Sequence, residues 1–184
     1  MNMEMLTVLD ENGIPTGEVL SRKEIHRQGL WHEAILVAII NEQNKVLMQQ
    51  RSQEKDKFPG LWDLTVAGHV PAAEIPIDTV FSEMMEEMGL VLPKRTKLSE
   101  LKHIKTFRDQ RIIADDFIEN QFYNLYVAHA NVDPAKIIMQ EDEVQQLKLL
   151  SLFEVQKFAK EGLCHPRTQW IDFVKTHASR SAFR

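Results

Sequence analysis

Apolar residues between positions 77 and 88 recur at spacings of three and four, the period of a helix with one buried face. This apolar stripe consists of Ile77, Val80, Phe81, Met84 and Met88. We expect these residues, together with the adjoining Met85, to be packing residues. Gly89 follows where a left-handed residue commonly ends a helix. The segment is therefore predicted to be an amphipathic helix that lies on the core.

Short apolar runs elsewhere in the chain predict β-strands. Residues 6–9 and 18–20 should form a hairpin through the turn at 10–13, and further strands are expected at 34–40, 45–50, 64–67, 101–107, 121–130 and 144–150. Residues 152–161 and 167–177 follow the helical period and should form the closing helices. This order of elements predicts an α/β fold in which helices cover both faces of a mixed sheet.

Composition narrows the class of protein. The chain has 184 residues, of which 43% are hydrophobic, so it is long enough for one domain with a substantial core. Its net charge of −5 argues against charge-driven binding to nucleic acids or anionic membranes. The longest apolar run, residues 34–40, is far shorter than the roughly 20 residues of a membrane-spanning helix. Cys164 is the only cysteine, which excludes an internal disulfide and fits a cytoplasmic location.

Three glutamates lie close together on the predicted helix. Glu83, Glu86 and Glu87 are related by spacings of three and four, so their charges repel by a few tenths of a kcal/mol per pair. A divalent cation relieves this repulsion, and Mg²⁺ prefers carboxylate oxygens and shares its other positions with water and substrate phosphates. A cluster of this kind by itself is more often a solvated acidic face. Its meaning therefore depends on the surrounding sequence.

The surrounding sequence supplies a longer pattern with fixed spacing. Its positions are Gly68, Glu74, Glu83, Met84, Glu86, Glu87, Gly89 and Leu90. This pattern resembles the Nudix box, with one departure: Ser82 stands in place of the arginine that orients the box glutamates by charge-assisted bonds. The resemblance implies a single Nudix domain over 1–184. It comprises an N-terminal β-hairpin extension at 1–31, an α/β/α sandwich with a mixed β-sheet at 32–160, and a C-terminal helix and tail at 161–184.

A second, narrower resemblance is to the isopentenyl diphosphate isomerase branch of the same superfamily. It is carried by segments at 8–10, 31–32, 49–52, 58–60 and 68–69. It implies a second metal site formed by His26, His32, His69 and Glu119. The first two histidines are not on one helical face, so only the fold could bring them together. The catalytic positions of the isomerases differ here, because Ala67 replaces a cysteine and Gln121 replaces a carboxylate, and neither side chain relays protons.

Together the two resemblances imply an isomerase-like scaffold with hydrolase chemistry. In this interpretation water attacks one phosphorus of a diphosphate, and Mg²⁺, with Mn²⁺ as a substitute, makes that water more acidic and offsets charge on the leaving oxygens. The metal ligands would be Glu83, Glu86 and Glu87. Gly68 would let the backbone approach the metal or phosphate, and Glu74 would secure the loop before the helix.

The general base is open between Glu87, Glu141 and Glu143. Two other functions also stay open at this point. One is isomerisation of isopentenyl diphosphate by an unusual acid, and the other is a nucleotide-binding sensor without catalysis, because a fold does not fix a function. Intact box glutamates favour hydrolysis over both.

The expected substrate is a small-molecule diphosphate, with nucleoside diphosphates and their linked derivatives ahead of prenyl diphosphates. Arg51 is the expected phosphate-binding residue, and Lys57 and Arg111 are weaker candidates. Aromatic residues near strands more often belong to the core, but several could stack on a base: Phe58, Trp62, Trp31, Phe107 and Tyr123. The N-terminal hairpin and the C-terminal helix could form the interface of a homodimer.

Overall fold

The structure is a computed structural model that describes residues 4–88 and 99–178. The predicted helix stop at Gly89 and the last box position, Leu90, lie outside the described residues. The strands are β1 (Met5–Leu9), β2 (Pro15–Ser21), β3 (Trp31–Ile40), β4 (Lys45–Arg51), β5 (Trp62–Leu64), β6 (Val66–His69), β7 (Ser99–Ala114), β8 (Phe117–His129) and β9 (Val144–Ser151). The helices are α1 (Arg22–Gln28), α2 (Pro76–Met88), the 3₁₀ turn η1 (Pro134–Lys136), α3 (Leu152–Lys160) and α4 (Trp170–Ala178).

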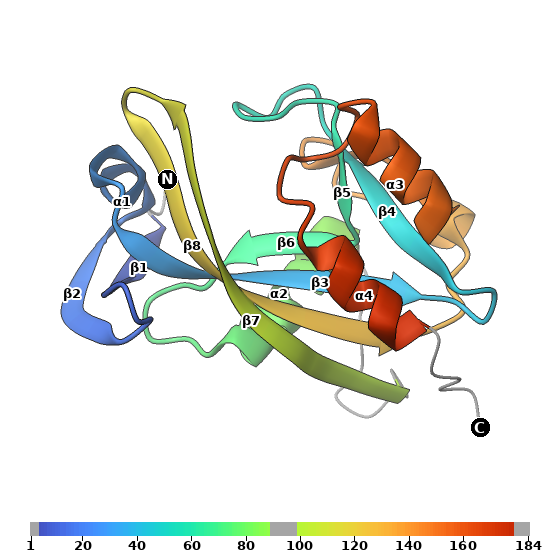
Figure 1. Ribbon diagram of the computed structural model, residues 1–184, viewed down its shortest axis with the longest axis horizontal. Coiled ribbons are helices and arrows are strands. Elements are labelled where there is room, and N and C mark those ends of the chain that lie inside the picture. Colours follow the sequence, from blue (N-terminus) through green and yellow to red (C-terminus); the bar gives the residue numbers. More distant parts are fainter. Residues whose placement is uncertain (1–3, 89–98, 179–184) are drawn as a thin grey trace.

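Strand β3 is the centre of a mixed sheet. It pairs in parallel with β8 and antiparallel with β1, β4 and β6, while β4 also pairs with β5 and β9. The long β7–β8 hairpin continues this sheet beyond β3 (Figure 1). Because β3 has neighbours along both sides, its backbone groups are satisfied within the sheet, and it can be buried without an exposed edge.

Both faces of β3 are covered, and the period of two along the strand sorts its side chains between two cores. Ala34, Leu36 and Ala38 pack in a cluster that includes residues of α3 and α4. Ile35, Val37 and Ile39 pack in a cluster that includes residues of α2. Figure 1 shows α4 in front of β3 and α2 behind it. The predicted α/β/α arrangement with a mixed sheet, an N-terminal hairpin and a C-terminal helix is confirmed.

The buried stripe of α2 is narrower than its sequence predicts. Val80, Met84 and Met88 are fully buried, whereas Phe81 is 41% exposed and Met85 is 52% exposed. Packing of the last two residues was therefore wrongly predicted. Each lies one residue, or about 100° of helix rotation, beyond a buried neighbour, which turns it away from the sheet.

The sequence pattern missed the helix α1. Its N-cap is Ser21, whose side chain accepts from the backbone N–H of Glu24, and Gly29 ends it at φ 64°. A helix of seven residues is too short to show a clear period. It matters for the site because it presents the buried His26.

Several boundaries also differ from the predicted ones. The single strand expected at 64–67 is two strands, separated at Thr65, whose hydroxyl donates to the carbonyl of Leu47 at 2.5 Å. The strands β7 and β8 extend further than their apolar runs, because pairing in a hairpin does not require burial. The last helix begins at Trp170 rather than at residue 167, and the residues before it enter the site described below.

Candidate active site

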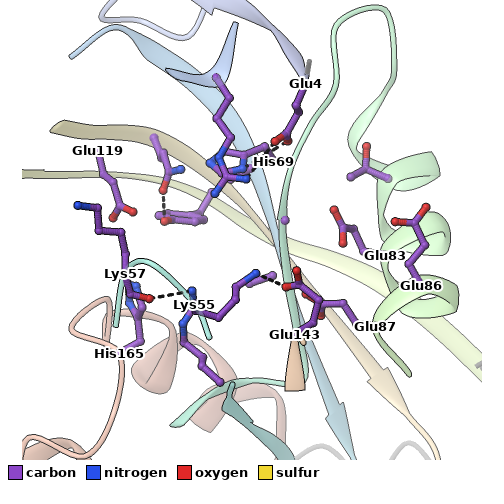
Figure 2. A pocket seen from close by; sticks show the side chains of 18 of the residues that line it. Glu4, Lys55, Lys57, His69, Glu83, Glu86, Glu87, Glu119, Glu143 and His165 are labelled. Carbon is purple, nitrogen blue, oxygen red and sulfur yellow. Dashed lines mark hydrogen bonds and ion pairs between the residues drawn. The ribbon is translucent and has the colours of Figure 1, made fainter. Parts of the chain in front are cut away.

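The three box glutamates lie along one cavity beside α2. Glu87 is buried, Glu83 is partly buried and Glu86 is exposed, so the helix presents them at increasing distance from the core. Glu143, just before β9, joins them and forms an ion pair with Lys55 (Figure 2). The amide of Gln49 on β4 donates to Glu87 at 3.4 Å. We call the set Gly68, Glu83, Glu86, Glu87 and Glu143 the acidic wall.

Gly68 gives the acidic wall its close packing. A Cβ at this position would overlap the carboxylate of Glu83. Strand β6 and helix α2 lie in contact, so the missing side chain lets a carboxylate rest directly against the strand. The space that the sequence assigned to a metal or phosphate is therefore occupied in part by a metal-ligand candidate itself.

The charges of the acidic wall are poorly compensated by protein groups. Burial, with the nearby charges of Glu86, Glu4 and Glu143, raises the pKa of Glu83 to about 7. Burial, with Glu83 and Glu143 nearby, raises the pKa of Glu87 well above its ordinary value. Clustered carboxylates with raised pKa values favour either protons or a cation. Their oxygens are the ligands that a hard divalent cation prefers, so this donor set fits such an ion.

Two further box positions have local partners. The hydroxyl of Thr79 donates to Glu74 at 3.1 Å, which ties the loop before α2 to the first turn of the helix. The hydroxyl of Ser82 donates to the carbonyl of Asp78 at 3.3 Å, one turn back in the same helix. Within the described residues the cation closest in role to the missing box arginine is Lys55, which lowers the pKa of both Glu83 and Glu87 against these larger effects.

The fold brings the three predicted histidines together. His26 comes from α1, His32 from β3 and His69 from β6, and one ring nitrogen of each lies within 4.8 Å of the others. Burial, with nearby His69 and Arg22 adding to it, lowers the pKa of His26 to about 4, so its ring is neutral near pH 7. Both ring nitrogens of His26 and one oxygen of Glu119 are buried without a partner in the described structure. Of the three rings only His26 has buried unpartnered nitrogens, because Nε2 of His32 faces the amide of Gln121 and Nδ1 of His69 lies 3.5 Å from Glu4. The imidazole donor set fits a metal ion that displaces these two contacts.

A cavity of about 450 Å³ is lined by the acidic wall and, from the histidine cluster, by His69; His26 and His32 are not lining residues. Predicted site residues that line it are Gly68, Glu74, Glu83, Glu86, Glu87, Glu143, His69, Glu119, Arg51, Lys57, Phe58 and Tyr123. Figure 2 shows the box glutamates on one side of the cavity, and Lys57, His165 and Glu119 on the other. Sequence positions far apart are thus brought to one space.

Of the residues predicted to bind substrate, some line the cavity and others do not. Arg51 lines the cavity and donates to the carbonyls of Lys57 at 3.1 Å and Phe58 at 3.2 Å, so it also shapes the loop after β4. Trp62 does not line the cavity. It is buried in the core against Phe158, so its assignment to substrate stacking is corrected, because β5 directs its ring toward α3.

Phe107, Trp31 and Arg111 also lie outside the cavity lining. Phe107 packs in the core, and Trp31 contacts Phe122. Arg111 is paired with Asp109 at 2.9 Å. None of the three is therefore placed to bind a substrate in this cavity.

The candidates for the general base are reduced to two. Glu141 is exposed and is not a lining residue of the cavity, whereas Glu87 and Glu143 both line it. A general base must come within hydrogen-bond reach of the water that it activates. Glu87 and Glu143 therefore remain as candidates, and Glu141 does not.

Two further residues of the cavity, His165 and Arg167, carry no signal in the sequence. We call Arg51, His165 and Arg167 the basic wall; all three line the cavity. The buried Arg167 forms an ion pair with Asp63 and donates to the hydroxyl of Tyr123 at 3.1 Å. His165 belongs to no motif, and the helical period assigned Arg167 to the last helix, which in fact begins at Trp170. Only the pairing of this segment with β5 reveals its role.

Arg167 also begins a directional chain of hydrogen bonds. An arginine only donates, so Tyr123 must donate to the amide oxygen of Gln121, and the amide N–H of Gln121 then faces Nε2 of His32 at 3.0 Å. Nδ1 of His32 lies 3.1 Å from the carbonyl of Leu30 and carries the proton. The chain thus fixes the tautomer of a histidine that is distant in sequence.

Comparison with known proteins places the chain in a family. The NUDIX domain model matches residues 30–171. The chain belongs to the Nudix hydrolase family. Hydrolases of this family generally use divalent metal ions, and the family resemblance found in the sequence is confirmed. Among the described residues, none of the helices combines the length and apolar character needed to cross a membrane.

Named relatives include both hydrolases and isomerases. The chain is 32% identical to Nudix hydrolase 3 of Arabidopsis thaliana over 86% of its own length, but it spans only 20% of that protein. It is 29% identical to an uncharacterised Nudix hydrolase of Clostridium acetobutylicum, over 86% of this chain and 75% of the relative. It is also 31% identical to an isopentenyl-diphosphate Delta-isomerase of Pectobacterium atrosepticum, over 84% of this chain and 80% of the isomerase.

Solved structures support the Nudix fold. The Deinococcus radiodurans protein DR0079 has a TM-score of 0.70 at 14% identity, over 98% of this chain and 100% of that one. The NUDIX domain of Shewanella oneidensis NrtR, solved with ADP ribose, has a TM-score of 0.59 at 19% identity, over 79% of this chain and 86% of that domain. At these identities the likeness shows the fold alone.

Proposed function

We propose that this Nudix hydrolase is Mg²⁺-dependent and cleaves a diphosphate bond in a nucleoside diphosphate or a nucleoside diphosphate-linked compound. The observation that carries the proposal is the acidic wall, where four carboxylates line one cavity with a single lysine paired among them. The raised pKa values of Glu83 and Glu87 indicate a site that lacks a compensating cation. Mn²⁺ offers the same oxygen preference and should substitute.

The residues of the acidic wall divide the work. Glu83, Glu86 and Glu87 would hold the divalent ion, which would supply Lewis acidity and charge neutralisation at the phosphoryl oxygens. Glu143 is the proposed general base, because its pairing with Lys55 fixes its carboxylate beside the other three. Glu87 is buried and contacts Gln49, which suits a ligand better than a group that must exchange protons with water. Glu74 would hold the loop that carries the cavity edge.

At the end of β4, Arg51 would bind a substrate phosphate. Its guanidinium is fixed by two backbone carbonyls, so little side-chain entropy is lost on binding. Phe58 lines the cavity next to it and could contact the base or sugar. This assigns phosphate recognition to β4 and the loop that follows it.

A second metal site is proposed at His26, His32, His69 and Glu119. It is supported by the converging ring nitrogens and by the unpartnered atoms of His26 and Glu119 among the described residues. Elemental analysis of the purified protein, with a His26→Ala variant alongside, tests the metal.

Isomerisation receives no support from the residues around this second site. Ala67 lines the cavity with only a methyl group, and Cys164 is buried with its thiol directed at the carbonyl of Val155.

The test of the function is product release from a panel of nucleoside di- and triphosphates, nucleotide sugars, dinucleotides and isopentenyl diphosphate, with Mg²⁺ or Mn²⁺. Glu86→Gln should abolish metal-dependent cleavage, and Glu141→Gln, an exposed glutamate outside the cavity lining, should not. Cleavage that persists in Glu86→Gln at saturating Mg²⁺ would contradict the metal assignment. Tight binding without turnover of any compound would instead support a sensor, and formation of dimethylallyl diphosphate an isomerase.

A further inference from the structure

The basic wall is held in place by backbone pairing. The backbone N–H of Trp62 on β5 donates to the carbonyl of Leu163 at 2.8 Å, and the backbone N–H of His165 donates to the carbonyl of Trp62 at 2.8 Å. The segment before α4 is thereby joined to β5 through a parallel bridge between Trp62 and Cys164. His165 and Arg167 are consequently part of the sheet framework, and their side chains line the cavity from a fixed backbone.

The guanidinium of Arg167 is immobilised before any ligand binds. Asp63 and the Tyr123 hydroxyl hold its two terminal nitrogens, and the ring of Tyr123 lies 5.1 Å from its central carbon. Its Nε is buried and has no hydrogen-bond partner in the described residues. A buried donor without an acceptor is costly, and a rigid one binds an acceptor with little loss of entropy.

His165 adds a second donor beside Arg167. Its Nδ1 accepts from the backbone N–H of Arg167 at 3.3 Å, so the proton of the neutral ring is on Nε2. The ring meets Phe58 edge-on at 4.4 Å. Burial and the surrounding charges of Arg167, Arg51 and Arg111 keep the pKa of His165 far below its ordinary value. The imidazole is therefore a neutral donor in a positive environment.

The positive charge of the basic wall is incompletely offset. Asp63 compensates Arg167, but Arg51 donates only to backbone carbonyls and makes no ion pair with the described residues. Glu119 faces the same region, and burial raises its pKa although Arg167, Arg111 and Arg51 oppose this. An anion that enters this end of the cavity gains from the uncompensated charge of Arg51 and from donors already in place.

We propose that the basic wall binds an anionic group, a phosphate or a carboxylate, on the half of the substrate farther from the acidic wall. The proposal rests on the proposed hydrolysis for the identity of the substrate but not for the binding itself. A hydrocarbon tail would exclude water from these guanidinium and imidazole donors and offer them no hydrogen-bond acceptor. The geometry therefore selects diphosphate compounds with a further charged group over prenyl diphosphates, and over nucleotide sugars whose sugar is uncharged.

Binding is tested without metal or turnover, by titrating inorganic phosphate into the protein in the presence of EDTA and measuring heat release. The main variant is Asp63→Asn combined with Arg167→Gln, which removes both members of the buried pair and leaves no lone charge. Phosphate affinity should fall at least about tenfold, the value of one charge-assisted hydrogen bond. His165→Phe, which keeps the ring against Phe58, should also weaken binding, so the test survives if the double variant does not fold.

Arg108→Gln is the matched control, because this arginine lies over Trp31, outside the cavity lining, and should leave phosphate affinity unchanged. The substrate arms compare UDP-glucuronate with UDP-glucose for a carboxylate, and ADP-ribose 2′-phosphate with ADP-ribose for a phosphate. At least one charged member should be preferred about tenfold in kcat/KM, and the double variant should lose that preference. The proposal is overturned if the double variant and His165→Phe both bind phosphate as tightly as the wild type does. Absence of hydrolysis of every compound contradicts only the proposed function.

Discussion

The acidic wall and the basic wall face the same cavity, but they are built in opposite ways. The acidic wall takes three of its carboxylates from a single helix, where a fixed spacing places them together whatever the rest of the chain does. The basic wall is assembled from the end of β4 and a segment before α4, and its Arg167 is 104 positions from the Asp63 that holds it. The three helical carboxylates of one wall are set by local geometry, and the other wall forms only in the folded protein.

The two walls also differ in what they contribute to stability. The acidic wall buries carboxylates and gathers like charges, which together raise the pKa of Glu83 to about 7, so the folded protein loses stability as pH rises from the ordinary pKa of 4.5 through about 7. The basic wall gathers a compensated ion pair and a continuous hydrogen-bond chain. We therefore expect the first to be removable without unfolding the protein, and the second to be needed for the fold.

The largest expected effect is on folding. Arg167→Gln leaves Asp63 buried without its cation, and we expect the free energy of unfolding to fall by about 3–5 kcal/mol. Adding Asp63→Asn should recover most of that loss, because no lone charge then remains. Urea denaturation of the two variants measures the difference. Equal stability of the single and the double variant would show that the pair is not coupled.

The next effect is on turnover. Glu87→Gln should lower kcat by about 100-fold or more, because it removes a buried carboxylate from the proposed metal site. Its melting temperature without metal should not fall, since one of the repelling charges is gone. Steady-state kinetics test the expected fall in kcat, and thermal unfolding at pH 8 without metal tests the melting temperature. A variant that is both active and unstable would reverse the comparison between the walls.

The pH dependence of stability follows from the raised pKa values. Glu83 and Glu87 bind protons more tightly in the folded than in the unfolded protein, so their stabilisation is present below the ordinary pKa of 4.5 and is lost as pH rises through about 7 for Glu83. His26, with a lowered pKa of about 4, acts in the opposite sense. The difference between wild type and a Glu83→Gln, Glu87→Gln double variant isolates the glutamates.

In EDTA, the melting temperature of the wild type relative to that of the double variant should fall by a few °C between pH 4.5 and pH 8. Saturating Mg²⁺ should reduce this loss of melting temperature near pH 8, because the bound ion replaces the protons on the carboxylates. A difference that is independent of pH would show that the carboxylates are not perturbed in the folded state.

A smaller effect is expected at Gly68. Gly68→Ala places a methyl group where the Glu83 carboxylate lies, and that flexible end can swing aside. The protein should fold, but Mg²⁺ affinity measured by calorimetry should fall by roughly tenfold, the equivalent of about one lost ligand interaction. Unchanged affinity would remove Glu83 from the ligand set.

The smallest effect is expected at Ser82. Its hydroxyl is used by the carbonyl of Asp78 in its own helix, so Ser82→Ala should change kcat/KM by less than about twofold. Lys55→Gln should be more damaging in the same assay, because it releases Glu143. If Ser82→Ala proved the more harmful change, Lys55 would not be the cation that serves the acidic wall.

Much of the fold could be read from the sequence, and the exceptions have physical causes. The period of three and four predicted α2, yet it placed Phe81 and Met85 in the core because the pattern cannot show how wide a stripe the sheet covers. The helix α1 was missed because two turns carry too little periodicity. Trp62 was misassigned because an aromatic residue beside a loop looks the same in sequence whether it faces ligand or core.

The sequence by itself determined the family, the acidic helix and the residue types that suit a divalent cation, because spacing along one helix fixes which side chains are neighbours. Tertiary structure alone decided that Glu143 rather than Glu141 joins them, that three histidines from three elements meet, and that Arg167 lines the cavity. These side chains are neighbours only through strand pairing between distant segments, and pairing partners are chosen by the packing of the whole sheet rather than by any local pattern.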